Sequence, residues 1–164
     1  MKKSFLLSFC LGFGIVSSGW SSGLPKPSVL ALMKALQDTN VEVRTGAAQA
    51  FAAVPDAAEQ AIKPLETALI ASADGAEQDA LVKALIAAND SATPKRLSEA
   101  LSNPQFNWGT GAKAKAVDVI GKIGQKKMIK WLTDLVAGEQ EPPVRAAAAR
   151  ALGDIGAPPK KEKS

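Results

Sequence analysis

The sequence is poor in side chains that perform acid–base or nucleophilic chemistry. Its 164 residues include no histidine, no tyrosine and a single cysteine, Cys10. A Ser-His-Asp or Cys-His centre cannot be built without histidine, and zinc, copper and haem lack their usual nitrogen and sulfur ligands. Carboxylates and lysines are the groups left for such chemistry. We therefore expect no enzymatic activity, no bound metal and no cofactor.

Cations are the charged groups whose spacing stands out. Arg44, Lys113 and Arg145 occupy the same position in the first, third and fourth units of the repeat described below. One interpretation is a cationic row that binds a partner. The other is a ladder, in which each cation bonds loop carbonyls or an Asp of its own unit or of the next. We favour the ladder. Lys113 and Arg145 are kept as candidate binding residues, together with Lys122 and Arg150, which we expect to face outward.

Aromatic residues are concentrated in one loop, "SNPQFNWGTG" (102–111), which carries Phe106 and Trp108. Aromatic side chains exposed on a rigid scaffold are typical binding anchors. The alternative is that they fold back and cover the edge of the structure. Both residues are candidate binding residues, whereas Trp131, in an amphipathic stretch, is expected in the core.

The elements that must position these residues form a repeat. One leucine ends an apolar stretch in each unit, and the spacings between these leucines are 33, 32 and 34 residues: Leu36, Leu69, Leu101 and Leu135. An alanine-rich stretch follows each of them. The alanine-rich phrase "VRTGAAQAFAAV" (43–54) returns as "VRAAAARALGDIG" (144–156). Helical spacing places Val144, Ala148, Leu152 and Ile155 on one face, and likewise Val43, Ala47, Phe51 and Val54. The pattern predicts an all-α fold, an α-solenoid of about four antiparallel helix pairs.

The expected helix ends carry recognisable signals. Asn40 is expected to cap a helix from Val41, and Asp74 with Glu77 has capping-box spacing. Prolines in the first turn are expected at Pro64, at Pro143 and after a Thr93 cap at Pro94. Gly124, Gly138 and Gly156 are expected to end helices. Gly121 and Gly153 are expected to allow close helix packing.

These units resemble HEAT repeats of the short bacterial type also found in phycobilin lyases. The first unit matches at Asp38, Val43, Arg44, Ala47 and Ala48, and the fourth at Val144, Arg145, Ala147, Ala148, Leu152, Gly153, Ile155 and Gly156. The resemblance covers roughly 27–157 and implies the fold. Because a solenoid presents a long surface made by the second helix of each unit, we predict a non-catalytic scaffold that binds another protein. One alternative is a lyase-like or chaperone-like enzyme related to the phycobilin lyases, and a second is nucleic-acid backbone binding.

The distribution of charge favours a protein partner. The net charge is +4, but residues 24–159 hold 15 basic and 15 acidic side chains. A nucleic-acid binder usually carries a basic excess on its folded body, so we expect no nucleic-acid partner. The halves differ, since residues 24–92 hold five basic and nine acidic groups and residues 93–159 hold ten and six. This asymmetry suits a partner of opposite polarity or head-to-tail self-association.

The N-terminus has the layout of a secretory signal peptide. Lys2 and Lys3 precede an apolar run from Phe5 to Val16, which is too short to span a bilayer. We expect a signal peptide over 1–23, cut after Gly19 or Gly23, a HEAT-repeat domain over 24–157 and a short basic disordered tail over 158–164. The mature protein is then periplasmic or secreted, with no stable membrane insertion and no cysteine.

The mass of the exported protein tests whether this leader is removed. Because its three regions match an export signal, the natively exported protein should have a mass that corresponds to a start between Trp20 and Leu24. Intact-mass spectrometry of the exported protein tests this. A mass that retains Met1 to Val16 would instead indicate a membrane anchor.

Overall fold

The computed structural model describes residues 23–106, 108–139 and 141–156. These residues form nine α-helices and one 3-10 helix, without a β-strand among them. The helices are α1 (Lys26–Ala35), α2 (Val41–Ala53), α3 (Pro55–Gln60), α4 (Ile62–Ala71), α5 (Gly75–Ala88), α6 (Thr93–Ser102), α7 (Thr110–Ile123), η1 (Lys126–Met128), α8 (Ile129–Gly138) and α9 (Pro142–Gly156). The predicted all-α solenoid is confirmed, with α1/α2, α4/α5, α6/α7 and α8/α9 as its four helix pairs.

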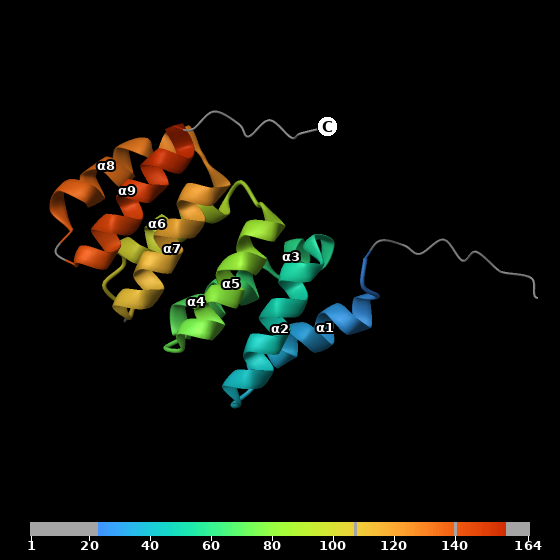
Figure 1. Ribbon diagram of the computed structural model, residues 1–164. Coiled ribbons are helices and arrows are strands. Elements are labelled where there is room, and N and C mark those ends of the chain that lie inside the picture. The colour runs from blue at the N-terminus through green and yellow to red at the C-terminus, as the bar shows by residue number, and fades with distance from the viewer. Residues whose placement is uncertain (1–22, 107, 140, 157–164) are drawn as a thin grey trace, which may run out of the picture.

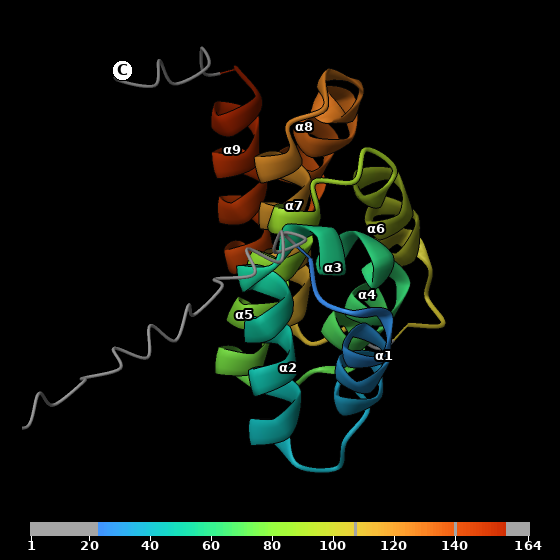
Figure 2. The same ribbon diagram turned by 90° about the vertical axis from the view of Figure 1, so that its right-hand side faces the viewer.

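The pairs stack in two layers. The second helices α2, α5, α7 and α9 lie side by side and contact one another in that order (Figure 1). The first helices α1, α4, α6 and α8 form the other layer, as the turned view in Figure 2 shows. The core lies between the two layers. No helix among the described residues is long and apolar enough to cross a membrane.

The short helix α3 lies outside the predicted pairs. Pro55 begins it because proline lacks the amide hydrogen that α2 would need to continue, and the preceding Val54 leaves the helical region at φ −130° and ψ 86°. Ala57 and Ala58 of α3 are buried, and α3 packs on α5. Helix α4 begins two residues before Pro64, which stays within the first turn, where an amide needs no intrahelical acceptor.

The predicted caps hold in most places. The side chains of Asn40 and Asp74 each accept a 2.8 Å hydrogen bond from a backbone N–H at the start of α2 and α5. The reciprocal half of the capping box is wrong, because the Glu77 side chain turns to other partners. Thr93 is also not the cap of α6. It is the first helical residue, and its hydroxyl donates to Asp90 at 3.1 Å.

The glycine ends differ from one another. Gly124 ends α7 as predicted, in a left-handed conformation at φ 74° that suits glycine. Gly138 and Gly156 are instead the last residues of α8 and α9.

The alanine-rich face of α9 packs closely on α7 in the core. On α9 the buried residues are Val144, Ala147, Ala148 and Ala151, whereas Leu152 and Ile155 are only partly buried. The buried face of α9 therefore points more toward α7 than the predicted face of Val144, Ala148, Leu152 and Ile155. A Cβ atom added to Gly121 of α7 would lie 2.5 Å from the Cβ of Ala151, which explains the glycine. The same prediction was wrong for Gly153, whose added Cβ would meet nothing within 4 Å.

The two glycines provide a test of this packing. Gly121→Ala should lower the free energy of unfolding, because overpacking costs about 1–3 kcal/mol and a gain in helix propensity of about 1 kcal/mol offsets only part of it. Gly153→Ala should raise it by up to about 1 kcal/mol, since only the propensity changes. Urea unfolding measures both. Equal effects of the two variants would contradict the close approach of α7 and α9.

Candidate functional site

Arg44 links the first two units through a buried carboxylate. Its Nε and Nη2 donate to the two carboxylate oxygens of Glu77 at 2.6 and 3.0 Å, and its Nη1 donates to the carbonyls of Asp38 and Thr39 at 2.9 and 3.2 Å. The hydrogen bond to Glu77 raises the pKa of Arg44. Glu77 is almost fully buried and also accepts from the Ser72 hydroxyl at 2.8 Å. Arg44 therefore neutralises a buried charge and fixes the loop before α2.

The other two cations of the row have comparable roles. Lys113 forms an ion pair with Glu141 of the following unit, and this hydrogen bond lowers the pKa of the Glu141 carboxyl. Arg145 donates to the Glu139 carbonyl of its own loop at 2.9 Å. The contacts agree with the ladder that the sequence favoured, with glutamates in place of the expected aspartate. Lys113 and Arg145 consequently have structural partners within the chain.

A second network, which the sequence analysis missed, joins the first helices. Arg96 on α6 donates to both carboxylate oxygens of Glu66 on α4 and, at 2.7 Å, to Asp90. The bond to Glu66 raises the pKa of Arg96. Burial opposes the charged form of Asp90, but hydrogen bonds from Arg96 and Thr93 outweigh it and lower the pKa of Asp90. The separation of Glu66 from Arg96, close to one repeat, is the signal that could have indicated this pair.

The two aromatic residues of the 102–111 loop have different environments. Trp108 is buried, and its indole N–H donates to the Ala100 carbonyl at 3.1 Å. Phe106 is 43% exposed. Trp131 is partly buried between α6 and α8 and lines a shallow hollow with Glu99 and Pro104. Of the two loop aromatics, Phe106 is the one that a partner could touch without rearrangement.

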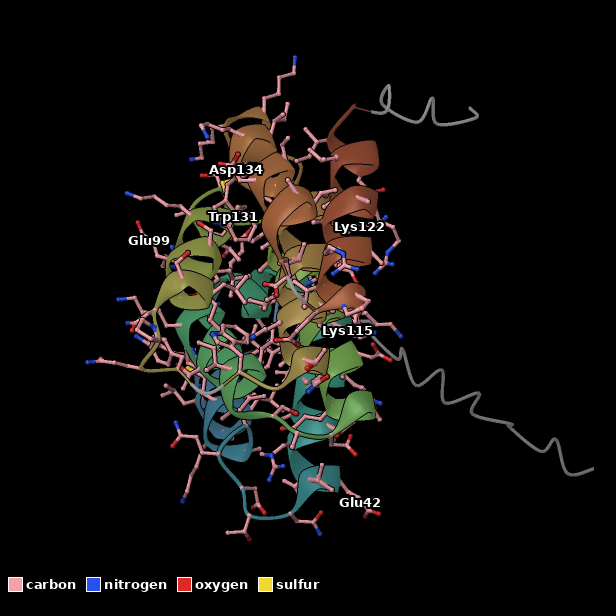
Figure 3. The ribbon with its side chains drawn as sticks, turned by 90° about the vertical axis from the view of Figure 1, so that its left-hand side faces the viewer. Glu42, Glu99, Lys115, Lys122, Trp131 and Asp134 are labelled. Atoms are coloured by element: carbon pink, nitrogen blue, oxygen red, sulfur yellow. The ribbon has the colours of Figure 1, made fainter. Side chains whose placement is uncertain are left out.

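The outward side of α2, α5, α7 and α9, here named the second-helix face, carries ion pairs between units. Lys115 pairs with Asp79, Lys122 with Asp154 at 3.0 Å, and Arg150 with Asp118 at 3.1 Å. Figure 3 shows Lys115 and Lys122 on this face and Glu99, Trp131 and Asp134 on the opposite side of the stack. Lys122 and Arg150, both predicted to face outward, therefore lie on one surface, whereas Phe106 and Lys113 belong to other regions.

Two hollows indent the second-helix face. One, of about 460 Å³, lies over α5, α7 and α9, with Val82 and Ile86 among its lining and the side chains of Asp118, Lys122, Arg150 and Asp154 around them. The other, of about 500 Å³, lies between α2 and α5 and is lined by Gln49, Ala52, Ala53, Ala76, Asp79, Ala80 and Lys83. Val82 and Ile86 were not predicted as site residues, because a helical apolar pattern does not show which residues a neighbouring helix leaves uncovered.

The stacked pairs and their inter-unit contacts define an α-solenoid. Residues 95–163, which include most of the third unit and the fourth unit, match the family described as HEAT repeats. This part of the chain is therefore similar to HEAT repeats, and the helix pairs that precede it continue the same α-solenoid. A comparison with curated proteins finds no match for the chain. HEAT repeats generally mediate protein–protein interaction and are typically non-catalytic. Within the described ranges no group of three or more His, Cys, Asp or Glu residues could hold a metal ion.

The loop aromatics can be separated by single substitutions. Trp108→Ala should destabilise the protein by about 3–5 kcal/mol, because it removes a buried aromatic ring. Phe106→Ala should change the stability by less than about 0.5 kcal/mol, as exposed positions usually do. Chemical unfolding of both variants gives the two values. A large loss for Phe106→Ala would show that its ring is part of the core.

Proposed function

We propose that this protein is an exported, non-catalytic scaffold that binds another protein through the second-helix face. The observation that carries the proposal is the hollow over α5, α7 and α9, which exposes Val82 and Ile86 among charged side chains. An apolar centre within a polar rim is the usual arrangement of a protein-binding surface. The partner would insert an apolar side chain between α5 and α7.

The hollow exists because the repeat is irregular at this step. Val82 and Ile86 of α5 are equivalent by a shift of 35 residues to Val117 and Gly121 of α7. Val117 and Gly121 are fully buried, and Ala151 of α9 packs directly on Gly121. Val82 and Ile86 are only partly covered by α7. The contact between α5 and α7 therefore leaves Val82 and Ile86 partly exposed, whereas the contact between α7 and α9 buries the equivalent residues of α7.

The charged rim suits reversible binding. Exposed ion pairs contribute only about 0–1 kcal/mol each to stability, so Lys122 and Arg150 can exchange their intramolecular acids for acids of a partner at little cost. The acidic first half and basic second half of the chain favour a partner of reversed polarity. Such complementarity acts mainly on the association rate and weakens with salt.

Export rests on the N-terminal sequence, which lies outside the described residues, as does the basic tail expected over 158–164. The Lys2-Lys3 pair, the apolar run and the small residues that follow form the three regions of a signal peptide. The partner is accordingly sought outside the cytoplasm.

Ile86→Arg tests the proposed surface. The substitution fills the hollow with a charged side chain, so binding to the partner should fall at least about thirtyfold, the loss expected at a binding hot spot. The partner is first identified by cross-linking from position 86 in the native compartment. The purified pair is then measured by calorimetry, with circular dichroism as the check on folding.

Leu30→Arg is the matched control. It places the same charge on an exposed apolar residue of α1, in the other layer, and should leave the affinity unchanged. Equal affinity of the wild type and a folded Ile86→Arg protein would refute the second-helix face as the binding surface.

A further inference from the structure

The two ends of the helix stack expose faces that the interior of the stack buries. Helix α2 lies at one end and α9 at the other (Figure 1). The phrase "VRTGAAQAF" on α2 corresponds to "VRAAAARAL" on α9 by a shift of 101 residues. Val144 on α9 is 2% exposed, but the equivalent Val43 on α2 is 41% exposed. The same sequence face is therefore covered in one unit and open in the other.

Helix α9 shows how this face is used. Helical spacing places Val144, Ala147 and Ala151 on one side of α9, all three are buried, and Ala151 packs against Gly121 of α7. The equivalent residues of α2 are Val43, Gly46 and Ala50. Gly46 has nothing within 4 Å of an added Cβ, and Ala50 is only partly buried. Helix α2 thus has the same face with which α9 packs on the helix before it. Among the described residues, no unit precedes α2 and covers this face.

The opposite end carries the receiving face. Helix α9 packs on the side of α7 that carries Val117 and Gly121. A shift of 32 residues gives the equivalent residues of α9, which are Ala149 and Gly153. Ala149 is exposed, and Gly153 has open space around it. On the first-helix layer Ile129 of α8 is 42% exposed. Solenoids that stay monomeric usually have a polar outer face on their terminal repeats.

We propose that a second copy of this chain docks end to end, with its α2 packed on α9 of the first copy as α9 packs on α7. The joint would continue the interface between repeats, with Val43, Gly46 and Ala50 of one copy against Ala149 and Gly153 of the next.

The charges beside the joint are complementary. Asp38 and Glu42 lie at the α2 end, and Arg145, which donates to the Glu139 carbonyl of its own loop, lies at the start of α9. Inside the chain Arg44 and Lys113 each pair with a glutamate of the following unit. Glu42 of the second copy would bring an acid to the basic α9 end in the same way. The acidic first half and the basic second half of the chain also favour contact between opposite ends of two copies.

The joint is heterologous, because it uses different surfaces of the two copies. Such a contact leaves one free end on each partner and extends into chains or closes into a ring. A two-fold dimer would not behave in this way. This difference provides a specific test.

Gly46→Arg and Gly153→Arg each block one end. Both glycines are helical and have open space, so the substitutions should not lower the melting temperature. The mass of the purified wild-type protein, measured by light scattering after size exclusion, should rise with concentration. Each variant should weaken self-association at least about tenfold, since an unpaired charge is placed in the joint. Gly75→Arg, at an exposed glycine of α5, is the matched control and should associate like the wild type.

Mixing the variants gives the decisive result. Gly46→Arg retains a free α9 end and Gly153→Arg a free α2 end, so the mixture should form one-to-one dimers and nothing larger. A wild-type protein that stays monomeric at every concentration, or a mixture that forms no dimer although the wild type associates, overturns the proposal. Val43→Lys and Ala149→Arg replace either glycine variant that fails to fold. Gly153 also lines the hollow over α5, α7 and α9. Gly46→Arg and Ala149→Arg lie outside that hollow and therefore separate the joint from the second-helix face, and Ile86→Arg should not affect self-association.

Discussion

The structure depends on the close approach of neighbouring second helices, which small side chains permit. Gly121 and Ala151 meet at a distance that no residue larger than glycine at position 121 could accept without movement of α7 or α9. With the helices this close, many short van der Waals contacts replace the few large side chains of an ordinary core. Phe51 is the only phenylalanine among the buried core residues described. The alanine-rich composition is thus a requirement of the stacking geometry.

Electrostatic contacts between units differ in importance according to burial. Glu77 is buried, so its charge must be compensated, and Arg44 does this with two hydrogen bonds. Removal of one partner from a buried pair leaves an uncompensated charge, which is costly. The pairs on the second-helix face are exposed and contribute little to stability. The chain therefore fixes the alignment of its units through buried pairs, and the exposed pairs add little to it.

The same arrangement separates the residues engaged inside the stack from the proposed binding surface. Trp108, Lys113 and Arg145 are engaged by neighbouring residues of the chain. Val82 and Ile86 remain partly uncovered because α7 does not cover α5 as α9 covers α7. An irregular step in an otherwise regular stack thus gives the protein its apolar hollow. The regular steps supply the rigidity that keeps the hollow in shape.

The sequence by itself determined the four helix pairs, although not the short helix α3, and several of the helix ends, because these ends depend on interactions within a few residues. The Asn40 and Asp74 caps and the left-handed Gly124 are local in this sense. The ladder of Arg44, Lys113 and Arg145 could also be inferred, since the repeat places equivalent residues in equivalent contacts. The period of about 33 residues was enough to indicate a solenoid.

Only the tertiary structure decided which surfaces are open. Val43 and Val144 begin the same phrase on equivalent helices, yet only Val144 is covered. Phe106 and Trp108 share one loop, yet of the two only Trp108 is buried in the stack. The Glu77 side chain left its expected capping position because the Arg44 guanidinium of the neighbouring unit offered a charged partner. Burial depends on what lies beside a helix in space, and no local pattern contains that information.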